Sequence, residues 1–474
     1  MPTVSLRSPW RGAVPATERS PWLREALRRE VGPGPRSLQE SLRCDVCIVG
    51  GGYSGMWTAL ELRARHPSLE IVVLEGDVCG GGASGTNAGY LGSLWPKMKS
   101  LRAMTTSEEA GRIVDASSQA VEAIVAFCDE HSIKAQLRRS PHLWVASNAA
   151  QLAALDKMSR LPGLPFRRLT REEAIEATGS GVHMGGLADE AALTVQPALL
   201  ARGLRRVALE EGIQVYEQTP VVLLRSMGGV TVTTECGAVV RAERVALTIN
   251  AWACELPGLS DSMVLLASDS LLTTPVPDRL EQLGLGQGFA ASDVRRRLNY
   301  YRTTGDGRLL FGKGAVDLRL GSRLGGTAWG PSNRLRLLRR HMDRLYPSLA
   351  NDQPAFTWTA PVEYSTTSLP FCDQVPGVPG AWYATGYSGS GIGPSRLLAR
   401  ILASLLAGDA DEWRSSVLVG KPSIRLPPEP VRWLGGQFVR LALARSESVE
   451  DRGNSPSALV RRAAAADPTT FSAS

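Results

Sequence analysis

Three glycines with the spacing G-x-G-x-x-G stand between an apolar segment and a segment with helical periodicity. Gly50, Gly52 and Gly55 follow residues 46–49 and open a helix expected over 54–65. The first glycine permits a tight turn, the second lets backbone N–H groups approach a pyrophosphate, and the third lets the helix pack closely on the strand. The helix N-terminus adds a positive potential. The pattern therefore predicts a turn that binds a dinucleotide.

An acidic residue follows where such a turn needs one. Glu75 ends a second apolar segment, residues 69–75, about 20 residues beyond Gly55. A carboxylate there accepts hydrogen bonds from a ribose diol and repels a 2′-phosphate, which argues against NADP. The alternative is a glycine-rich turn of a Rossmann fold that holds no ligand.

Two further glycine-rich loops distinguish FAD from NAD. Residues 79–89 (CGGGASGTNAG) follow Glu75 closely, and their small and polar side chains suit a long extended cofactor. Residues 386–393 (GYSGSGIG) lead into a helix near Pro394, whose N–H groups and dipole suit an anionic flavin oxygen or the pyrophosphate. The sequence favours FAD, and the expected cofactor-binding residues are Gly50, Gly52, Tyr53, Ser54, Gly55, Glu75, Gly82, Ala83, Ser84, Asn87, Gly386, Ser388, Gly389, Gly391 and Ile392.

The elements that must position these loops follow from periodicity. Residues 46–49, 54–65 and 69–75 have the order strand, helix, strand, which implies a parallel pair. Further helices are expected at 106–132, 150–178, 197–212, 332–346 and 394–407, and further strands at 142–147, 214–216, 221–224, 230–233, 244–249, 299–303, 308–311, 356–364 and 382–385. Residues 1–40 are rich in Pro and Arg and predict an irregular arm, and a loop-rich stretch is expected before residue 299.

Length and composition indicate a globular protein of two or three domains. The chain has 474 residues, 43% hydrophobic and 21% charged. Its net charge of +7 comes mainly from scattered arginines without a long basic run, which argues against nucleic acid as a partner. Because it shows no N-terminal signal and no apolar run of about 18 residues, we expect no transmembrane segment and a cytoplasmic location.

The seven cysteines and five histidines have no spacing typical of a metal or disulfide site. Free thiols and no bound metal are therefore expected. Cys44 and Cys47 form a C-x-x-C, but they fall in an expected strand, where residues three apart point to opposite faces.

Longer runs around these glycines match the pattern of a known family. GGGYSGMWTALEL (50–62), VVLE (72–75) and CGGGASGTNAG are similar to its runs GGG-x-[T/S]-G-L-W-T-A and G-A-S-G-R-N-G-G. NYYRTTGDGRLLFG (299–312) resembles its Tyr-Tyr-Arg…Asp-Gly-Arg…Phe-Gly pattern, and ATGYSGSGIGPS (384–395) resembles its C-terminal flavin loop. The chain thus resembles the D-amino-acid-oxidase-like superfamily of FAD-dependent oxidoreductases, and in particular its γ-glutamylputrescine-oxidase-like branch.

The resemblance implies an α/β fold with a discontinuous Rossmann-like FAD-binding domain and an α+β substrate domain built on a mixed sheet. It divides the chain into an arm at 1–40, an FAD-binding domain at 41–100, 185–255 and 366–410, a substrate domain at 101–184 and 256–365, and a tail at 411–474. It implies oxidation of a C–N bond of a small amine or amino acid, with hydride transfer to flavin N5 and oxygen as acceptor. It also gives Val221 a backbone contact with the adenine.

Three departures from the family pattern concern the flavin. Thr86 replaces a common Arg and Ser390 replaces the usual His of the C-terminal loop, so the charge around the flavin differs. Relatives with covalent flavin use a Cys where this chain has Val362, so non-covalent FAD is expected. The Arg that clamps a substrate carboxylate in many related oxidases is missing from residues 361–370, where Glu363 instead favours a cationic amine.

On the substrate side, the expected strand 299–303 supplies the candidate catalytic residues Tyr300 and Arg302. Alternation places these two side chains on one face and Tyr301 on the other. Arg302 could bind a carboxylate and Tyr300 could line the pocket; in the alternative, the tyrosine is core and the arginine pairs with a surface acid. No obligatory acid–base residue is visible, which hydride transfer from a neutral amine tolerates.

Other interpretations stay open. The same motifs fit an FAD-dependent dehydrogenase of a 2-hydroxy acid or alcohol that uses an electron carrier, or a non-catalytic flavin-binding protein. Lys97 and Lys99 either assist the reaction with oxygen or form a solvated pair. The basic and apolar stretch 431–445 either lies on an anionic membrane surface or packs against the protein body.

Overall fold

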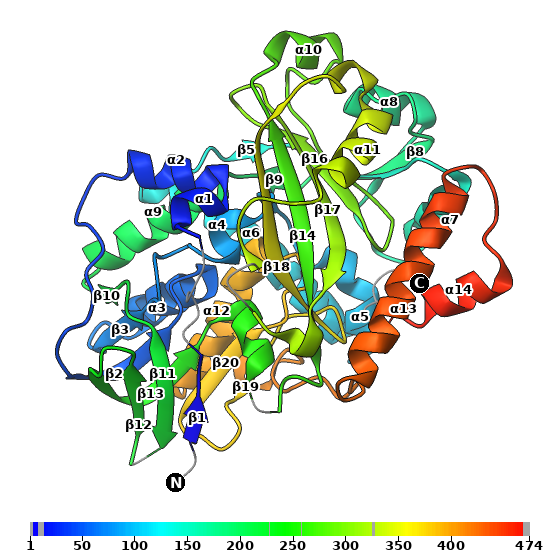
Figure 1. Cartoon of the computed structure of the whole chain (residues 1–474). Coiled ribbons are helices and arrows are strands. Elements are labelled where there is room, and N and C mark those ends of the chain that lie inside the picture. Colours follow the sequence, from blue (N-terminus) through cyan, green and yellow to red (C-terminus); the bar gives the residue numbers. More distant parts are fainter. Residues whose placement is uncertain (1–2, 8–13, 227, 257, 325–327, 468–474) are drawn as a thin grey trace.

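The predicted strand–helix–strand unit lies in the first of two large sheets (Figure 1). The computed structural model describes residues 3–7, 14–226, 228–256, 258–324 and 328–467. Strands β2 (Leu42–Val49) and β3 (Ile71–Leu74) pair in parallel with Val46 opposite Ile71, and helix α3 (Tyr53–Arg65) connects them. The expected Rossmann-like unit is confirmed.

In the described part of the chain, nine strands form this first sheet. The order is β1-β11-β12-β13-β2-β3-β10, with β20 beside the carboxyl end of β13 and β19 beside β20. Helices α3, α6, α9 and α12 contribute to one buried core with Ile48 and Val73 of the sheet. The bounds are β1 Thr3–Ser5, β10 Gln214–Tyr216, β11 Val221–Ser226, β12 Val230–Thr234, β13 Val239–Leu247, β19 Phe371–Gln374, β20 Ala381–Thr385, α6 Ser107–Glu130, α9 Pro197–Glu210 and α12 Ile392–Ala407.

A second sheet of eight described strands has the order β18-β14-β17-β16-β15-β6-β8-β7. β15 and β6 are parallel and the other pairs are antiparallel, so the sheet is mixed, as expected. Helices α8, α10 and α11 cover one face, where Tyr301 and Phe311 lie in a buried core. The bounds are β6 His142–Ala146, β7 Arg167–Leu169, β8 Gly185–Asp189, β14 Met263–Thr273, β15 Ala290–Asp293, β16 Asn299–Thr303, β17 Leu309–Leu318, β18 Pro354–Ser365, α8 Arg171–Thr178, α10 Pro277–Gln282 and α11 Leu335–Leu345.

The N-terminal segment is not the irregular arm that its composition predicts. β1 adds to the first sheet with Val4 opposite Leu224. Helix α2 (Pro21–Arg29) has proline at its first position, and the Ser20 side chain caps it. The helix then buries Trp22 and Leu23. The polar composition of residues 1–40 does not indicate these elements, because each is stabilised by contacts with residues far along the chain.

Three regions in and around the second sheet also differ from the prediction. The helix expected over 150–178 is interrupted: α7 (Ala149–Ser159) ends before residues 162–165, which contain two prolines, and α8 begins at a capping box formed by Thr170 and Glu173. Residues 185–189, expected with the FAD-binding segments, form β8 of the second sheet. Strand β14, in the stretch expected to be loop-rich, lies between β18 and β17.

The expectation that Cys44 and Cys47 point to opposite faces is wrong. Both lie in the same buried cluster on one face of β2. The backbone N–H groups of Asp45 and Val46 both donate to the Glu70 carbonyl, so the strand is irregular between the two cysteines. All seven cysteines are described, and each is a free thiol.

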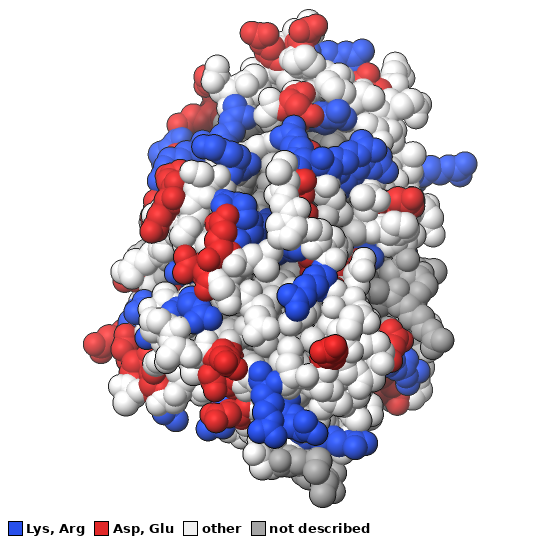
Figure 2. All heavy atoms as spheres, turned by 90° about the vertical axis from the view of Figure 1, so that its left-hand side faces the viewer, with Lys and Arg blue, Asp and Glu red and all other residues white. Residues whose placement is uncertain are grey.

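The C-terminal tail forms helices α13 (Val431–Glu450) and α14 (Ala458–Ala465), which lie at one edge of the molecule beside the second sheet (Figure 1). None of the described helices combines the length and the apolar character needed to cross a bilayer. On the face drawn in Figure 2, basic and acidic side chains are interspersed. The described residues contain no cluster of three His, Cys, Asp or Glu side chains suited to a metal.

Candidate functional site

A cavity of about 720 Å³ reaches from the glycine turn of the first sheet to strands β14, β16 and β18 of the second. Val49 and Leu74, which end β2 and β3, contribute to its lining. Parallel sheets of this kind place their ligand sites at the carboxyl ends of the strands. The cofactor loops and the substrate-side strand therefore share one cavity.

Most of the predicted cofactor residues line this cavity. They are Gly50, Gly52, Tyr53, Ser54, Glu75, Gly82, Ala83, Ser84, Asn87, Val221, Ser388, Gly389, Gly391 and Ile392. Gly55 and Gly386 lie outside the lining. A Cβ on Gly55 would lie 1.9 Å from the Gly50 carbonyl oxygen, and one on Gly386 would lie 2.7 Å from Cδ1 of Phe371. These two glycines therefore permit close packing behind the cavity.

Glu75 faces the cavity and also fixes the glycine turn. Its Oε2 accepts a hydrogen bond from the Gly51 N–H at 2.7 Å, and its Oε1 accepts one from the Asp77 N–H at 3.0 Å. Gly50 has a φ of +111°, and a Cβ there would lie 2.6 Å from the Thr248 carbonyl oxygen, so the turn requires glycine. The carboxylate and the N-terminus of α3 are complementary to a ribose diol and a diphosphate. The residues present therefore fit the adenosine diphosphate half of FAD.

The second glycine-rich loop contains one helical turn, α4 (Ala83–Thr86). Hydrogen bonds connect this loop to the start of α3 and to strand β18. Ser84 Oγ accepts a hydrogen bond from the Tyr53 N–H at 2.9 Å. Asn87 Oδ1 accepts one from the Gly89 N–H at 2.7 Å. Trp358 of β18 donates its indole N–H to the last carbonyl of α4 at 2.9 Å. The loop is thus fixed relative to the glycine turn and to the second sheet.

The C-terminal loop 386–393 brings a second helix N-terminus, that of α12, to the cavity. The hydroxyl oxygens of Tyr387 and Ser54 lie 2.6 Å apart and connect this loop to the start of α3. Ser388 Oγ accepts a hydrogen bond from the Ser365 N–H at 3.1 Å, which connects the loop to β18. Two helix N-termini therefore face one cavity, and both favour an anionic ligand.

The substrate-side wall is built around Tyr300. Its hydroxyl lies 2.8 Å from Ser268 Oγ and 2.9 Å from Ser270 Oγ, and all three side chains line the cavity. Burial raises the pKa of Tyr300. The predicted alternation holds: the Tyr301 hydroxyl points the other way and pairs with His183 in the core. The two serines were missed, although their alternation within the apolar run of β14 was the available signal.

A histidine on β6 completes this wall. His142 Nε2 lies 2.9 Å from Ser292 Oγ, and its ring centroid is 4.8 Å from that of Tyr90. Burial lowers the pKa of His142 to about 4, so its imidazole is neutral at pH 7. No sequence motif marks His142, because β6 joins the wall through pairing with the distant strand β15.

Arg302 lies outside the cavity lining, although it shares a face of β16 with Tyr300. Its guanidinium donates to the carbonyls of Ala88 at 2.5 Å and Val195 at 3.0 Å and lies over the Trp22 ring. Burial lowers its pKa to about 10. The geometry thus gives it a positioning role: it fixes the end of the 79–89 loop.

Two cavity-lining side chains, those of Glu363 and Lys97, are ionisable and lie where they could act on a ligand. Glu363 is 2% exposed and accepts hydrogen bonds from Asn250 Nδ2 at 2.8 Å and the Tyr387 N–H at 3.0 Å. Burial raises its pKa to about 7. Lys97 and Lys99 both line the cavity. Burial lowers the pKa of Lys97 to about 8, and the Lys99 side chain is exposed.

Comparison with known proteins decides the family. The model of the DAO family, described as FAD dependent oxidoreductase, matches residues 45–405. The chain belongs to the DAO family of FAD-dependent oxidoreductases. This DAO-family protein is therefore an enzyme that uses FAD, as its cavity and its sequence motifs both indicate.

Curated relatives agree with the predicted branch. The gamma-glutamylputrescine oxidoreductase of Escherichia coli (strain K12) is 27% identical over 387 residues, which cover 80% of this DAO-family chain and 87% of the relative. A probable oxidoreductase named OrdL from Haemophilus influenzae is 26% identical over 395 residues, covering 81% and 87%. The glycine oxidase of Pseudomonas aeruginosa is 27% identical over 379 residues, covering 77% and 94%.

Solved structures confirm the fold. Glycine oxidase from Geobacillus kaustophilus superimposes with a TM-score of 0.62 at 24% identity and covers 78% of this chain and 96% of its own. L-Proline dehydrogenase from P. horikoshii has a TM-score of 0.61 at 18% identity, covering 88% and 100%. The DAO-family fold, with its Rossmann-like unit and second mixed sheet, is therefore shown.

Proposed function

We propose that this enzyme oxidises a C–N bond of a small amine or amino acid, with oxygen as the electron acceptor. The names of the curated relatives support the substrate class, since they include a gamma-glutamylputrescine oxidoreductase and a glycine oxidase. When bound, FAD supplies the two-electron acceptor for this oxidation.

A single observation carries the proposal: most of the predicted cofactor residues and Tyr300 line the same cavity. Two serine hydroxyls fix the Tyr300 hydroxyl, so the wall has a polar group at one defined place. The remaining cavity lining includes Trp144, Leu161 and Met158, which suit an apolar part of a small substrate. The wall aligns such a substrate, and alignment is the main requirement for removing hydride from a neutral amine.

The residues around Tyr300 and Glu363 support an amine over a simple carboxylate, although the lining also includes the basic residue Lys97. His142 is neutral, and Arg302 lies outside the lining and donates to two backbone carbonyls, so neither clamps a carboxylate. Glu363 offers a carboxyl group that can pair with a cation once it loses its proton. We therefore assign Tyr300 to the substrate wall and leave Arg302 out of the substrate site.

We also propose that the flavin is held without a covalent bond to the protein. Val362, at the position where covalent relatives have a cysteine, lines the cavity. None of the seven cysteines, all within the described residues, is part of the lining. Precipitation with acid should release yellow FAD into the supernatant; a yellow pellet would contradict this assignment.

Anaerobic titration of the purified enzyme tests the reaction. Polyamines, γ-glutamyl amines, N-methylated amino acids and 2-hydroxy acids are added separately, and the flavin absorbance is followed. The proposal expects bleaching by an amine and release of peroxide when air is admitted. Bleaching by 2-hydroxy acids only, or reoxidation only by a dye, would show a dehydrogenase instead. A flavin that none of these compounds reduces would favour a non-catalytic protein.

A further inference from the structure

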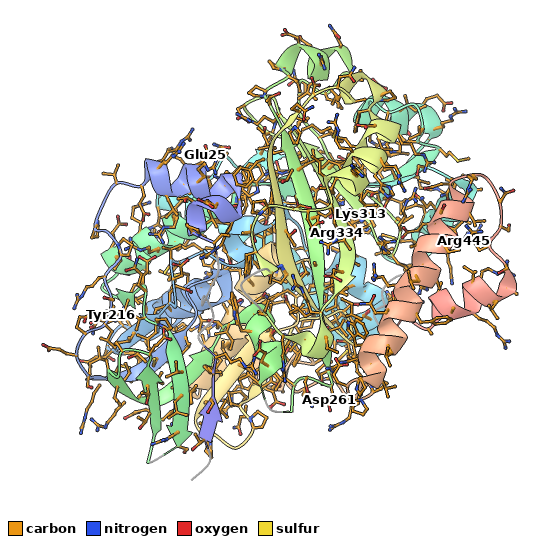
Figure 3. All side chains as sticks on the ribbon, viewed as in Figure 1. Glu25, Tyr216, Asp261, Lys313, Arg334 and Arg445 are labelled. Atoms are coloured by element: carbon orange, nitrogen blue, oxygen red, sulfur yellow. The ribbon has the colours of Figure 1, made fainter. Side chains whose placement is uncertain are left out.

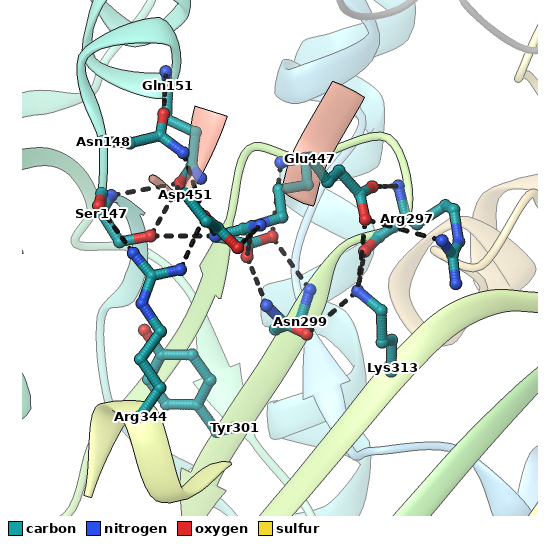
Figure 4. A network of polar contacts seen from close by, with 12 residues as sticks. Ser147, Asn148, Gln151, Arg297, Asn299, Tyr301, Lys313, Arg344, Glu447 and Asp451 are labelled. Atoms are coloured by element: carbon teal, nitrogen blue, oxygen red, sulfur yellow. Dashed lines mark hydrogen bonds and ion pairs between the residues drawn. The ribbon is translucent and has the colours of Figure 1, made fainter. Parts of the chain in front are cut away.

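One face of helix α13 is firmly attached to the second sheet. Trp433 Nε1 and Gln437 Nε2 donate to the Leu318 carbonyl at 3.2 and 3.4 Å, and Arg440 donates to the Val316 carbonyl at 3.3 Å. Further along, Glu447 approaches the buried Lys313 at 3.8 Å. Figure 4 shows Glu447 and Asp451, at the end of α13, in one network of polar contacts with residues of the second sheet. This face fixes the orientation of the helix.

The opposite face of α13 is apolar and exposed. We call the residues Val431, Leu434, Phe438 and Leu441 the α13 stripe. They recur every three or four positions, so they share one face of the helix. Each is between 58% and 62% exposed. Leu459 of the neighbouring helix α14 is 77% exposed. Because the other face holds the helix in place, the stripe cannot turn inward.

The charges beside the stripe have one sign. In residues 431–467, all of which are described, the exposed ionisable side chains are Arg445, Arg452, Arg461 and Arg462. The acids of this segment are buried or partly buried, and Glu447 and Asp451 pair with basic groups of the body. Arg445 continues the line of the stripe, and Figure 3 shows it on α13 at the edge of the molecule.

We propose that the α13 stripe and these four arginines bind the surface of an anionic phospholipid bilayer. An apolar line on a helix that also presents arginines and no exposed carboxylate is complementary to acyl chains below a layer of negative headgroups. The helix lies along the surface and does not cross the bilayer. The proposal is independent of the substrate, so its outcome and that of the amine oxidation assay are separate.

Cosedimentation of the FAD-loaded enzyme with vesicles tests the proposal. We expect binding to vesicles of phosphatidylcholine mixed with phosphatidylglycerol and weak binding to phosphatidylcholine alone. Raising the salt concentration should lower the affinity roughly tenfold, because salt screens exposed charges. Flavin content and turnover of the enzyme in vesicle-free solution serve as a check that each variant is folded.

Variants separate the apolar and the basic contributions. The double substitution Leu434→Ser with Phe438→Ser should lower vesicle affinity by roughly tenfold or more, because two apolar side chains no longer enter the bilayer. Arg461→Gln with Arg462→Gln should weaken binding to the anionic vesicles only. Val31→Ser is the matched control, because Val31 is apolar and 92% exposed but belongs to a different part of the surface; it should bind as the wild type does.

Three results would overturn the proposal. The first is failure of the wild type to bind anionic vesicles at low salt. The second is equal binding by the wild type and the Leu434→Ser/Phe438→Ser variant. The third is a light-scattering mass that is dimeric for the wild type and monomeric for that variant, which would make the stripe an interface between two copies of this chain.

Discussion

At the scale of single residues, the buried carboxyl groups of Glu75 and Glu363 have different surroundings. Glu75 accepts hydrogen bonds from the backbone N–H groups of Gly51, in the glycine turn, and of Asp77. Glu363 has one amide and one N–H donor, and no cation among the described residues forms an ion pair with it. Burial consequently favours its protonated form and raises its pKa to about 7.

The raised pKa of Glu363 predicts a pH-dependent stability. Its ordinary pKa is 4.5, so the folded protein keeps a proton that the unfolded chain releases between pH 4.5 and 7. The stabilisation present below pH 4.5 is therefore lost as the pH rises to 7, by roughly 3 kcal/mol at most. The titratable neighbours Cys254, Tyr364 and Tyr387 stay protonated over this range because burial raises each pKa.

Thermal unfolding of wild type and Glu363→Gln checks this prediction. Glutamine is neutral at every pH. The unfolding midpoint of the wild type should therefore fall relative to that of the variant between about pH 5 and pH 7.5, where the unfolded chain has lost the proton that the folded protein still holds. Above that range the two curves should run parallel. A constant difference from pH 5 upward would contradict the assigned titration.

Tyr300 predicts a kinetic effect. Tyr300→Phe removes the hydroxyl that Ser268 and Ser270 hold in the cavity. We expect kcat/KM for the amine to fall about tenfold, the value of one hydrogen bond, with the flavin spectrum unchanged. Tyr301→Phe is the control, because the Tyr301 hydroxyl bonds His183 in the core; it should lower stability and leave kcat/KM intact. Unaltered kinetics of Tyr300→Phe with every amine would remove Tyr300 from the substrate wall.

Some residues of the candidate site could be predicted from the sequence and others could not. Strand alternation correctly places Tyr300 and Arg302 on one face, but it does not tell how far along that face the cavity extends. Only Tyr300 reaches it. The glycines and Glu75 were predictable because a turn, a helix and a strand in succession require them within about 30 residues. Ser268, Ser270 and His142 come together only through strand pairing over long distances in the chain.

At the scale of elements, Arg302 connects strand β16 to the flavin loop. Arg302→Met leaves the carbonyls of Ala88 and Val195 without this donor, and we expect a loss of about 2–4 kcal/mol of stability. The thermal midpoint measures the loss, and Arg241→Met, on an exposed position of β13, is the control. A variant that keeps its midpoint but loses substrate affinity would show that Arg302 binds substrate.

The contact between α3 and the glycine turn gives a second prediction at this scale. Gly55→Ala would place a Cβ 1.9 Å from the Gly50 carbonyl oxygen, so α3 must move and FAD affinity should fall by about tenfold or more. Gly111→Ala is the matched control: Gly111 lies within α6, and its added Cβ meets nothing within 4 Å. This control should gain about 0.5–1 kcal/mol. Normal FAD affinity of Gly55→Ala would contradict the close packing.

Elements with local signals were predicted, whereas some that depend on distant partners were not. The unit β2–α3–β3 and the hairpin of β16 and β17 carry their own turns and periodicity. In contrast, β1 depends on β11, and β14 depends on β17 and β18, which lie far away in the sequence. The helix expected over 150–178 is interrupted for a local reason, since Pro162 and Pro165 are incompatible with a helix interior.

At the scale of the whole molecule, two sheets enclose one cavity, and the central claim is that its first half binds FAD. Titration of FAD-free protein with FAD, followed by flavin fluorescence, tests this most directly. We predict saturable binding by the wild type and roughly 10- to 100-fold weaker binding by Glu75→Ala, because charged hydrogen bonds at the ribose are lost. Glu70→Ala, exposed just before β3, should bind normally. Protein that stays colourless and takes up no added FAD, or equal binding by Glu75→Ala, would contradict the account.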